Sequence, residues 1–100
     1  MQELSSVQRK YLRGQAHHLE PLVLVGKQGV TETLVRSVSQ ALDAHELIKV
    51  RFNEHKPEKK ALVEEICRQT GCAAAGIVGH VAILYREQSD PQKRKIVLPR

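Results

Sequence analysis

Residues 22–31 read LVLVGKQGVT and contain three kinds of segment in succession. The run 22–25 is aliphatic and β-branched, which is typical of a short buried strand. The loop Gly26-Lys27-Gln28-Gly29 follows at once, and Thr31 can cap the start of a helix with its hydroxyl group. A strand that leads through a short loop into a helix predicts a sheet backed by helices.

The chain downstream of Thr31 continues to alternate between helix and strand. An amphipathic helix is predicted by the spacing of Leu34, Val35, Val38, Ala41 and Leu42. Residues 47–52 then alternate as a strand does, with Ile48, Val50 and Phe52 on one face and Lys49 and Arg51 on the other. One face of this predicted strand is therefore basic.

A third helix and a hairpin follow. Residues 53–57 are polar and turn-like, Pro57 fits the first turn of a helix, and Gly71 is placed to end that helix. Its inner side is expected to carry Leu62, Val63, Ile66 and Cys67. The runs 73–78 and 81–86 are separated by Gly79-His80, a spacing that suits a β-hairpin.

A first helix is predicted upstream of the opening stretch. Ser5 and Ser6 are natural N-caps, and Pro21 marks the end of the segment. Its apolar side chains at helical spacing are Val7, Tyr11, Leu12, Ala16 and Leu19. On another face Arg9, Arg13 and His17 recur every four residues, so we expect them to form one basic stripe.

The predicted order of elements is α-β-α-β-α-β-β. Strands that are linked through helices are expected to run parallel, and the final hairpin antiparallel. The expected fold class is therefore α/β (α+β), a single domain with one mixed four-stranded sheet and helices against it. The tail, residues 88–100, adds Lys93-Arg94-Lys95 and the short apolar run Ile96-Val97-Leu98.

Charge and aromatic content indicate how a partner would be bound. Sixteen Lys and Arg residues oppose eleven Asp and Glu residues, for a net charge of +5. Such a balance favours a polyanionic partner, although a basic protein with no anionic partner has the same charge. Tyr11, Phe52 and Tyr85 are the only aromatic residues, too few for a platform that stacks RNA bases. Nucleic acid would therefore be bound mainly through its sugar-phosphate backbone.

The loop Gly26-Lys27-Gln28-Gly29 is the candidate phosphate site. Two glycines allow φ > 0 and a close approach to the main chain, the next helix begins with free N–H groups, and Lys27 adds a full charge. The alternative is an ordinary strand-to-helix turn with a solvated lysine. A second Gly-x-x-Gly, residues 76–79, lies in an apolar strand without a cation, where packing and a hairpin turn explain it.

Several segments together resemble one family, the CRM domain (chloroplast RNA splicing and ribosome maturation). The matching segments are Gln8-Arg9, Tyr11-Leu12-Arg13, Ala16-His17, Leu19, Pro21, residues 25–31, residues 44–50, Leu84-Tyr85-Arg86 and Arg94-Lys95-Ile96. The resemblance runs from about residue 4 to residue 99, within a single domain of residues 1–100, and is greatest to the stand-alone bacterial YhbY type.

This resemblance implies a fold, a site and a role. The fold would be like the C-terminal domain of translation initiation factor three. The RNA-binding loop would be Gly26, Lys27, Gln28 and Gly29, analogous to that of KH domains, with basic support from Arg9, Arg13 and His17. The partner would be ribosomal RNA in precursors of the large ribosomal subunit. The outward Lys49 and Arg51 would add to the interface if they share a face with the loop.

Catalytic, metal and cofactor sites are not expected. His45-Glu46 begins like an H-E-x-x-H motif, but Lys49 occupies the position of the second histidine. The loop lacks the Ser or Thr of a Walker motif and the third glycine of a dinucleotide fingerprint. Cys67 and Cys72 have neither redox-pair nor zinc spacing and are expected to be buried thiols in a reducing compartment.

The remaining expectations concern location and partners. The chain shows no signal peptide and no run long enough to cross a bilayer, which favours a cytoplasmic protein, and nothing argues against a monomer. A basic adaptor that docks an acidic protein on ribosomal particles is the alternative function, and a small phosphate-ester enzyme is a weaker one.

Overall fold

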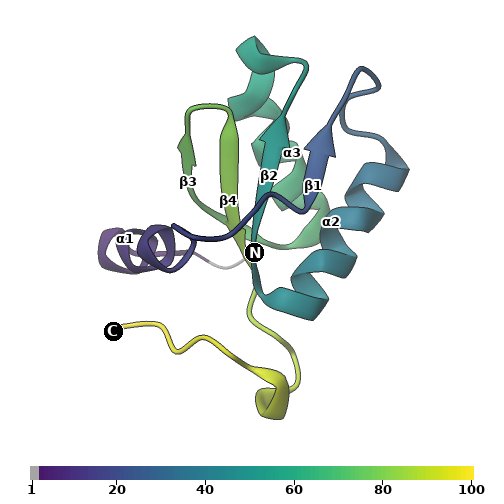
Figure 1. The fold of residues 1–100 in the computed structure, drawn as a ribbon. Coiled ribbons are helices and arrows are strands. Elements are labelled where there is room, and N and C mark those ends of the chain that lie inside the picture. The colour runs from purple at the N-terminus through teal and green to yellow at the C-terminus, as the bar shows by residue number, and fades with distance from the viewer. Residues whose placement is uncertain (1–2) are drawn as a thin grey trace.

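The computed structural model describes residues 3–100 and has the predicted order of elements (Figure 1). The helices and strands are α1 (Ser6–Gln15), β1 (Val23–Val25), α2 (Glu32–His45), β2 (Leu47–Phe52), α3 (Lys59–Thr70), β3 (Ala73–Val78) and β4 (Val81–Tyr85). A short 3-10 turn, η1 (Lys56–Glu58), precedes α3, and a second one, η2 (Pro91–Lys93), lies in the tail. The α/β fold class predicted from the sequence is confirmed.

The four strands form one mixed sheet in the order β1-β2-β4-β3. β1 pairs with β2 in parallel, and β4 pairs antiparallel with both β2 and β3. β2 and β3 therefore run in the same direction but are separated by β4. This arrangement brings the ends of β1, β2 and β3 to one edge of the sheet, together with the hairpin turn that leads into β4. We call this the loop edge, and it carries residues 26–31, 53–58 and 79–80.

Each face of the sheet has its own apolar cluster. Helices α2 and α3 cover one face, where Val50, Phe52 and Leu84 are fully buried. The other face is covered by α1 and by the tail, whose Ile96 and Leu98 pack beside Leu12 and Tyr85. Because α1 packs on β3 and β4, the β1 and β2 part of this second face stays open.

Helix α1 buries only part of the apolar set that the sequence predicted. The expected cap is present, since the Ser5 hydroxyl accepts from the Gln8 amide and the Gln8 side chain returns a bond to Ser5. Val7 is 60% exposed and Tyr11 37% exposed, whereas Leu12 is fully buried against the sheet together with Ala16. Of the apolar side chains predicted at helical spacing, Leu12 and Ala16 are therefore buried, whereas Val7 and Tyr11 are not.

The tail is held by a buried carboxylate at the end of α2. Glu46 is 1% exposed and has a left-handed φ of 63°. Its two carboxylate oxygens accept hydrogen bonds from the backbone amides of Gln88 (2.8 Å), Lys95 (2.6 Å) and Ile96 (3.1 Å). These bonds offset the cost of burying the charge and fix the path of the tail toward α1.

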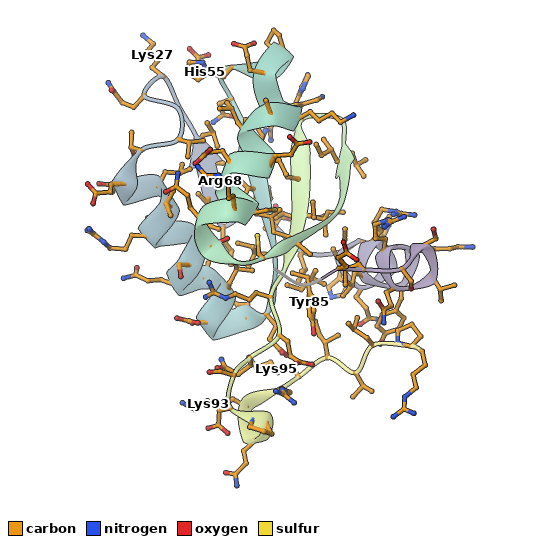
Figure 2. All side chains as sticks on the ribbon, turned by 180° about the vertical axis from the view of Figure 1, so that it is seen from behind. Lys27, His55, Arg68, Tyr85, Lys93 and Lys95 are labelled. Atoms are coloured by element: carbon orange, nitrogen blue, oxygen red, sulfur yellow. The ribbon has the colours of Figure 1, made fainter. Side chains whose placement is uncertain are left out.

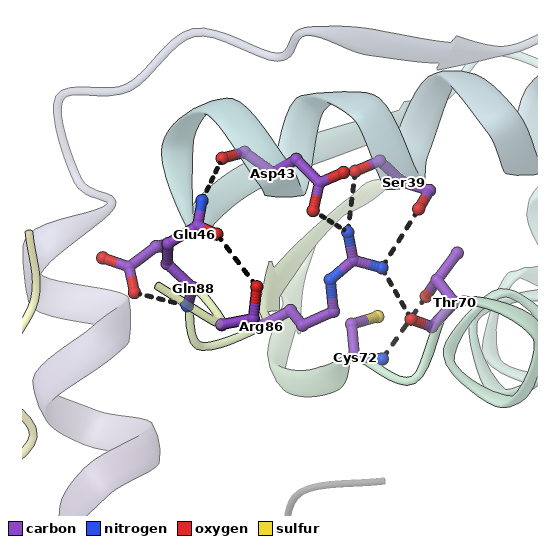
Figure 3. A network of polar contacts seen from close by, with 8 residues as sticks. Ser39, Asp43, Glu46, Thr70, Cys72, Arg86 and Gln88 are labelled. Atoms are coloured by element: carbon purple, nitrogen blue, oxygen red, sulfur yellow. Dashed lines mark hydrogen bonds and ion pairs between the residues drawn. The ribbon is translucent and has the colours of Figure 1, made fainter. Parts of the chain in front are cut away.

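Arg86 joins the ends of three elements beside Glu46 (Figure 3). Its guanidinium group donates to Ser39 Oγ and O on α2, to the Thr70 carbonyl on α3 and to the Asp43 carboxylate, at 2.7–3.1 Å. The Arg86 backbone amide also donates to the Glu46 carbonyl at 2.9 Å. The arginine is therefore a structural residue of the fold.

Both cysteines are buried free thiols, as predicted. Their Sγ atoms lie 3.4 Å apart, between α3 and the start of β3. The contact with Cys67 lowers the pKa of Cys72 to about 7, with help from Thr70 and Arg86, and the same contact raises the pKa of Cys67.

None of the helices within residues 3–100 has the length and apolar character needed to span a bilayer.

Candidate nucleic-acid interface

The loop at residues 26–29 forms a tight turn at the loop edge. The Gly29 amide donates to the Gly26 carbonyl at 3.0 Å, and Gly29 has a left-handed φ of 70°. Gly26 is not in the left-handed region, so only one of the two glycines needs the freedom that the sequence suggested. Lys27 and Gln28 stand at the tip of the turn and are exposed to solvent.

His55 braces this turn from the neighbouring loop. Its Nε2 atom lies 2.8 Å from the Lys27 carbonyl oxygen, which can only accept, so Nε2 carries the hydrogen. The imidazole ring also lies against Gly29, where an added Cβ would meet it at 3.6 Å. Figure 2 shows Lys27 and His55 together at one end of the molecule, with Lys93 and Lys95 of the tail at the other.

The start of α2 lies next to the turn. Thr31 caps the helix as predicted, with its hydroxyl accepting from the Leu34 amide at 3.1 Å. A hollow of about 400 Å³ is lined by the four loop residues together with Thr31, Thr33 and Ser37, and by aliphatic side chains of residues 22–24 and of Leu34. The positive end of the helix dipole and the turn therefore border the same space, which suits an anion.

A larger groove lies between α1 and the open part of the sheet. It has a volume of about 850 Å³. Four of the predicted basic residues line it: Arg13, His17, Lys49 and Arg51. Lys10 adds a further cation, and Glu20 is the one acidic residue in the lining. The floor is aliphatic and includes Val78, Val81 and Ile83.

Arg13 fixes the position of α1 over the sheet. Its guanidinium group donates to the Ala75 carbonyl at 2.9 Å, and its Cδ atom lies 2.9 Å from where a Cβ on Gly76 would be. Gly76 therefore lets the arginine chain cross β3 closely, while Gly79 has the left-handed φ of the hairpin turn. The second Gly-x-x-Gly of the sequence is thus explained by packing and by a turn, as predicted.

Arg9 does not join the basic groove, so the predicted stripe of Arg9, Arg13 and His17 is only partly right. The Arg9 side chain donates to the Leu4 carbonyl at 2.7 Å and to Ser6 Oγ at 3.2 Å, which turns it back over the start of α1. It borders a separate pocket beside Glu64 and Cys67 on α3. α1 ends at Gln15, and His17 reaches the groove from the segment that follows.

Two cations that sequence reasoning did not single out are Lys56, on the loop edge, and Lys59, the first residue of α3 beside it. The Lys59 ammonium group contacts the Gly79 carbonyl and lies 3.2 Å from Nδ1 of His80. The pKa of His80 is lowered by desolvation and by the positive charges of Lys59, Lys56 and Arg51. The run HKPEKK at residues 55–60 follows a strand, as the Gly-Lys-Gln-Gly loop does, and this parallel was the available signal.

The cations of the groove and loop edge form no ion pairs within the described part of the chain, although Glu20 borders the groove and Glu54 and Glu58 lie on the loop edge. Within residues 3–100 the ion pairs are Arg68–Glu65, Arg86–Asp43 and Arg94–Glu87. None of these pairs uses Lys27, Lys59 or a residue of the groove. The positive charge there is therefore available to an external anion. Over the same residues, no group of three His, Cys, Asp or Glu side chains is arranged to hold a metal ion.

Comparisons with known proteins agree on one family. The model of the CRS1/YhbY (CRM) domain matches residues 4–86. An RNA-binding protein of Haemophilus influenzae is 39% identical over 101 aligned positions, which cover 100% of this chain and 99% of the relative. The probable RNA-binding protein YqeI of Bacillus subtilis is 32% identical, with 96% of this chain and 99% of the relative covered.

A solved structure agrees with the fold. The solution structure of a hypothetical protein from Staphylococcus aureus superimposes with a TM-score of 0.80 at 30% sequence identity. The match covers 97% of this chain and 100% of the other. The order of elements and the mixed four-stranded sheet are therefore shared with an experimentally determined relative.

Proposed function

The chain belongs to the CRS1/YhbY (CRM) domain family, and we propose that it binds RNA through backbone phosphates. The contacts would be made by Gly26, Lys27, Gln28 and Gly29 at the loop edge, and by Arg13, His17, Lys49 and Arg51 in the groove. Arg9 would contribute less than the sequence suggested, because its side chain is engaged with the start of α1.

One observation carries this proposal more than any other. A turn with an exposed lysine lies beside the start of α2, and the unpaired cations of a separate groove lie on the adjoining face of the same sheet. Backbone amides, a helix dipole and Lys or Arg charges are the groups with which proteins hold phosphate oxygens. The relatives whose names identify them as RNA-binding proteins support RNA as the polyanion.

We propose further that the RNA is ribosomal and that the protein assists assembly of the large ribosomal subunit. The resemblance to the stand-alone YhbY type is the support for this role. The alternative, an adaptor that docks an acidic protein, would use the same positive charge. Sedimentation of a lysate separates the two: association with large-subunit precursors should be lost after complete RNase digestion, and persistence after digestion would favour the adaptor.

The loop is tested by Lys27→Ala in a titration with a structured ribosomal RNA fragment at several salt concentrations. The variant should bind all RNA fragments more weakly, and its log-log salt slope should be smaller by about 0.7–0.9, the value of one lost phosphate contact. Arg36→Ala is the matched control, because Arg36 is an exposed cation on α2 outside the groove and the loop. Equal affinity and slope for Lys27→Ala and the wild type would refute the role of the loop.

A further inference from the structure

We propose that the groove between α1 and the sheet binds an unpaired RNA strand, and that this strand continues into the phosphate loop. The inference rests on the proposed RNA-binding function and specifies the form of RNA that the groove accepts. The residues concerned line the groove and not the loop: Lys10, His17, Lys49, Arg51 and the aliphatic side chains of the floor.

The shape of the groove favours a single strand over a duplex. One wall of the groove is α1. Because a helix with its side chains is about 10–12 Å in diameter, this wall is no higher than that above the sheet. The floor is recessed between this wall and the segment of residues 19–21 that leads to β1. A double helix presents its phosphates on a broad convex surface and cannot enter such a recess, whereas an unpaired strand can spread its bases and backbone within it.

The floor of the groove suits nucleobases as well as phosphates. Arg51, Val81 and Val78 of the groove lie in register across β2, β4 and β3, and Leu24, which borders the hollow of the loop, continues this row on β1. Leu24 is 55% exposed and Val78 61% exposed, although both are aliphatic. Arg51 stands between them, and a planar guanidinium group can stack on a base while it contacts a phosphate. A duplex, whose bases are stacked inside, would leave these apolar side chains in water.

The basic side chains of the groove carry hydrogen-bond donors that have no partner within the described residues. Among the residues that the structure describes, the side chains of Lys10, His17 and Arg51 make no hydrogen bond, and Lys49 makes one weak contact, 3.4 Å to the His17 carbonyl. Arg13 donates through one terminal nitrogen and keeps the other free. The groove therefore presents several hydrogen-bond donors without partners and only one acidic residue, Glu20. The excess of basic side chains matches the repeating negative charge of a single RNA strand.

The groove adjoins the phosphate loop through one pair of residues: Arg51 lines the groove, and its partner on β1, Leu24, lines the hollow beside the loop. This row is the last one on the open face, since the row of Val25 and Phe52 that follows it faces the helices, and Gly26 comes directly after the end of β1. Arg51 also acts with Lys56 and Lys59 on the pKa of His80, so its charge reaches the hairpin turn. A strand that leaves the groove beside Arg51 therefore meets the further cations Lys56 and Lys59, although Glu54 and Glu58 also lie on the loop edge.

The test uses the whole protein with a fluorescent single-stranded RNA of about ten nucleotides, and with the same RNA annealed to its complement. Affinities are measured by anisotropy for the wild type, for the double variant Lys49→Gln/Arg51→Gln, and for Arg36→Gln/Lys60→Gln. The second pair is the matched control, because it removes the same charge from exposed positions on α2 and α3. Val78→Asp, at an exposed rim position, adds a test that does not remove a cation.

The groove variants should weaken single-strand binding by about tenfold or more while changing duplex binding less than twofold. The control pair should change both RNAs equally and little. Equal losses for the two RNAs in the groove variants, or no loss for the single strand, would overturn the inference while leaving RNA binding intact. If the wild type bound neither RNA, the proposed function itself would fail.

Discussion

His55 is the residue on which the shape of the proposed phosphate loop depends most directly. It adopts a left-handed φ of 59° and places its ring between the Lys27 carbonyl and Gly29. The ring donates to the Lys27 carbonyl, so this acceptor is satisfied within the protein. We therefore expect His55 to act by positioning the proposed loop rather than by touching RNA.

His55→Ala should raise the Kd for structured RNA several-fold, with a loss of unfolding free energy of no more than about 1 kcal/mol, because the lost bond is partly exposed. His55→Gln retains a side-chain donor and should recover part of the affinity. His45→Ala, an exposed histidine at the end of α2, is the control. Unchanged affinity in His55→Ala, measured by anisotropy, would mean that the turn holds its shape without the brace.

Tyr85 is a second residue whose environment makes a testable prediction. Its side chain is fully buried, and within residues 3–100 its hydroxyl has no hydrogen-bond partner. Burial, with the nearby negative charges of Glu46 and Glu87, raises the pKa of Tyr85 to about 12 from 10. The unfolded chain therefore releases this proton at lower pH than the folded chain, so the contribution to stability is complete below pH 10 and is lost between about pH 10 and 12.

Tyr85→Phe should flatten the fall in unfolding free energy between about pH 10 and 12, because the ionisable hydroxyl is gone. At neutral pH the change should be less than about 1 kcal/mol, since the hydroxyl makes no bond that the variant would lose. Urea denaturation across this pH range measures both effects, with Tyr11→Phe as the exposed control. An alkaline decline as steep as that of the wild type would contradict the account.

Among the helices and strands, features that depend on neighbouring residues, such as strand bounds and helix caps, were predicted correctly from the sequence. The alternation of residues 47–52 predicted β2 with its observed bounds, and Thr31 and Gly71 mark the cap of α2 and the end of α3 as expected. The buried face of α1 was predicted only in part. α1 carries two stripes offset by one residue, and only the sheet beneath it decides that Leu12 rather than Tyr11 is buried.

The tail shows why long-range contacts were beyond sequence reasoning. Residues 96–98 looked like a short apolar run, but their position depends on Glu46, fifty residues earlier in the chain. Nothing in the spacing of Glu46 signals a buried carboxylate, because it follows an amphipathic helix whose other acids are exposed. Its burial depends on three backbone amides of the tail that donate to its carboxylate, and these contacts span 42 to 50 residues of sequence.

Glu46→Gln should lower the unfolding free energy by about 1.5–3 kcal/mol, because the variant replaces charge-assisted hydrogen bonds and sets an amide donor against backbone donors. Amide hydrogen exchange at Lys95 and Ile96 should become faster, while RNA affinity should stay near that of the wild type. Glu64→Gln, exposed on α3, is the control. A tail that keeps its protection in Glu46→Gln would show that other contacts hold it.

At the scale of the whole molecule, the fold separates structural charges from available ones. Arg86, Glu46 and Asp43 are joined in a network around the end of α2, while the cations of the groove and loop edge are left without acidic partners. The sequence predicted most of these cations but not which of them share a face. That depended on β4 lying between β2 and β3, and on Arg13 reaching Ala75 across Gly76.

NMR can map whether RNA is held by the loop edge and the groove. A ribosomal RNA fragment is titrated into the isotope-labelled protein at low salt, and the amide signals are followed. Shifts should gather at residues 26–30, 49–51 and 78–81 and around Lys10 and Arg13, should be reversed by added salt, and should be small at Arg36, Lys60 and Glu64. Shifts confined to the outer surface of α2 and α3, or none at any RNA concentration, would contradict the account.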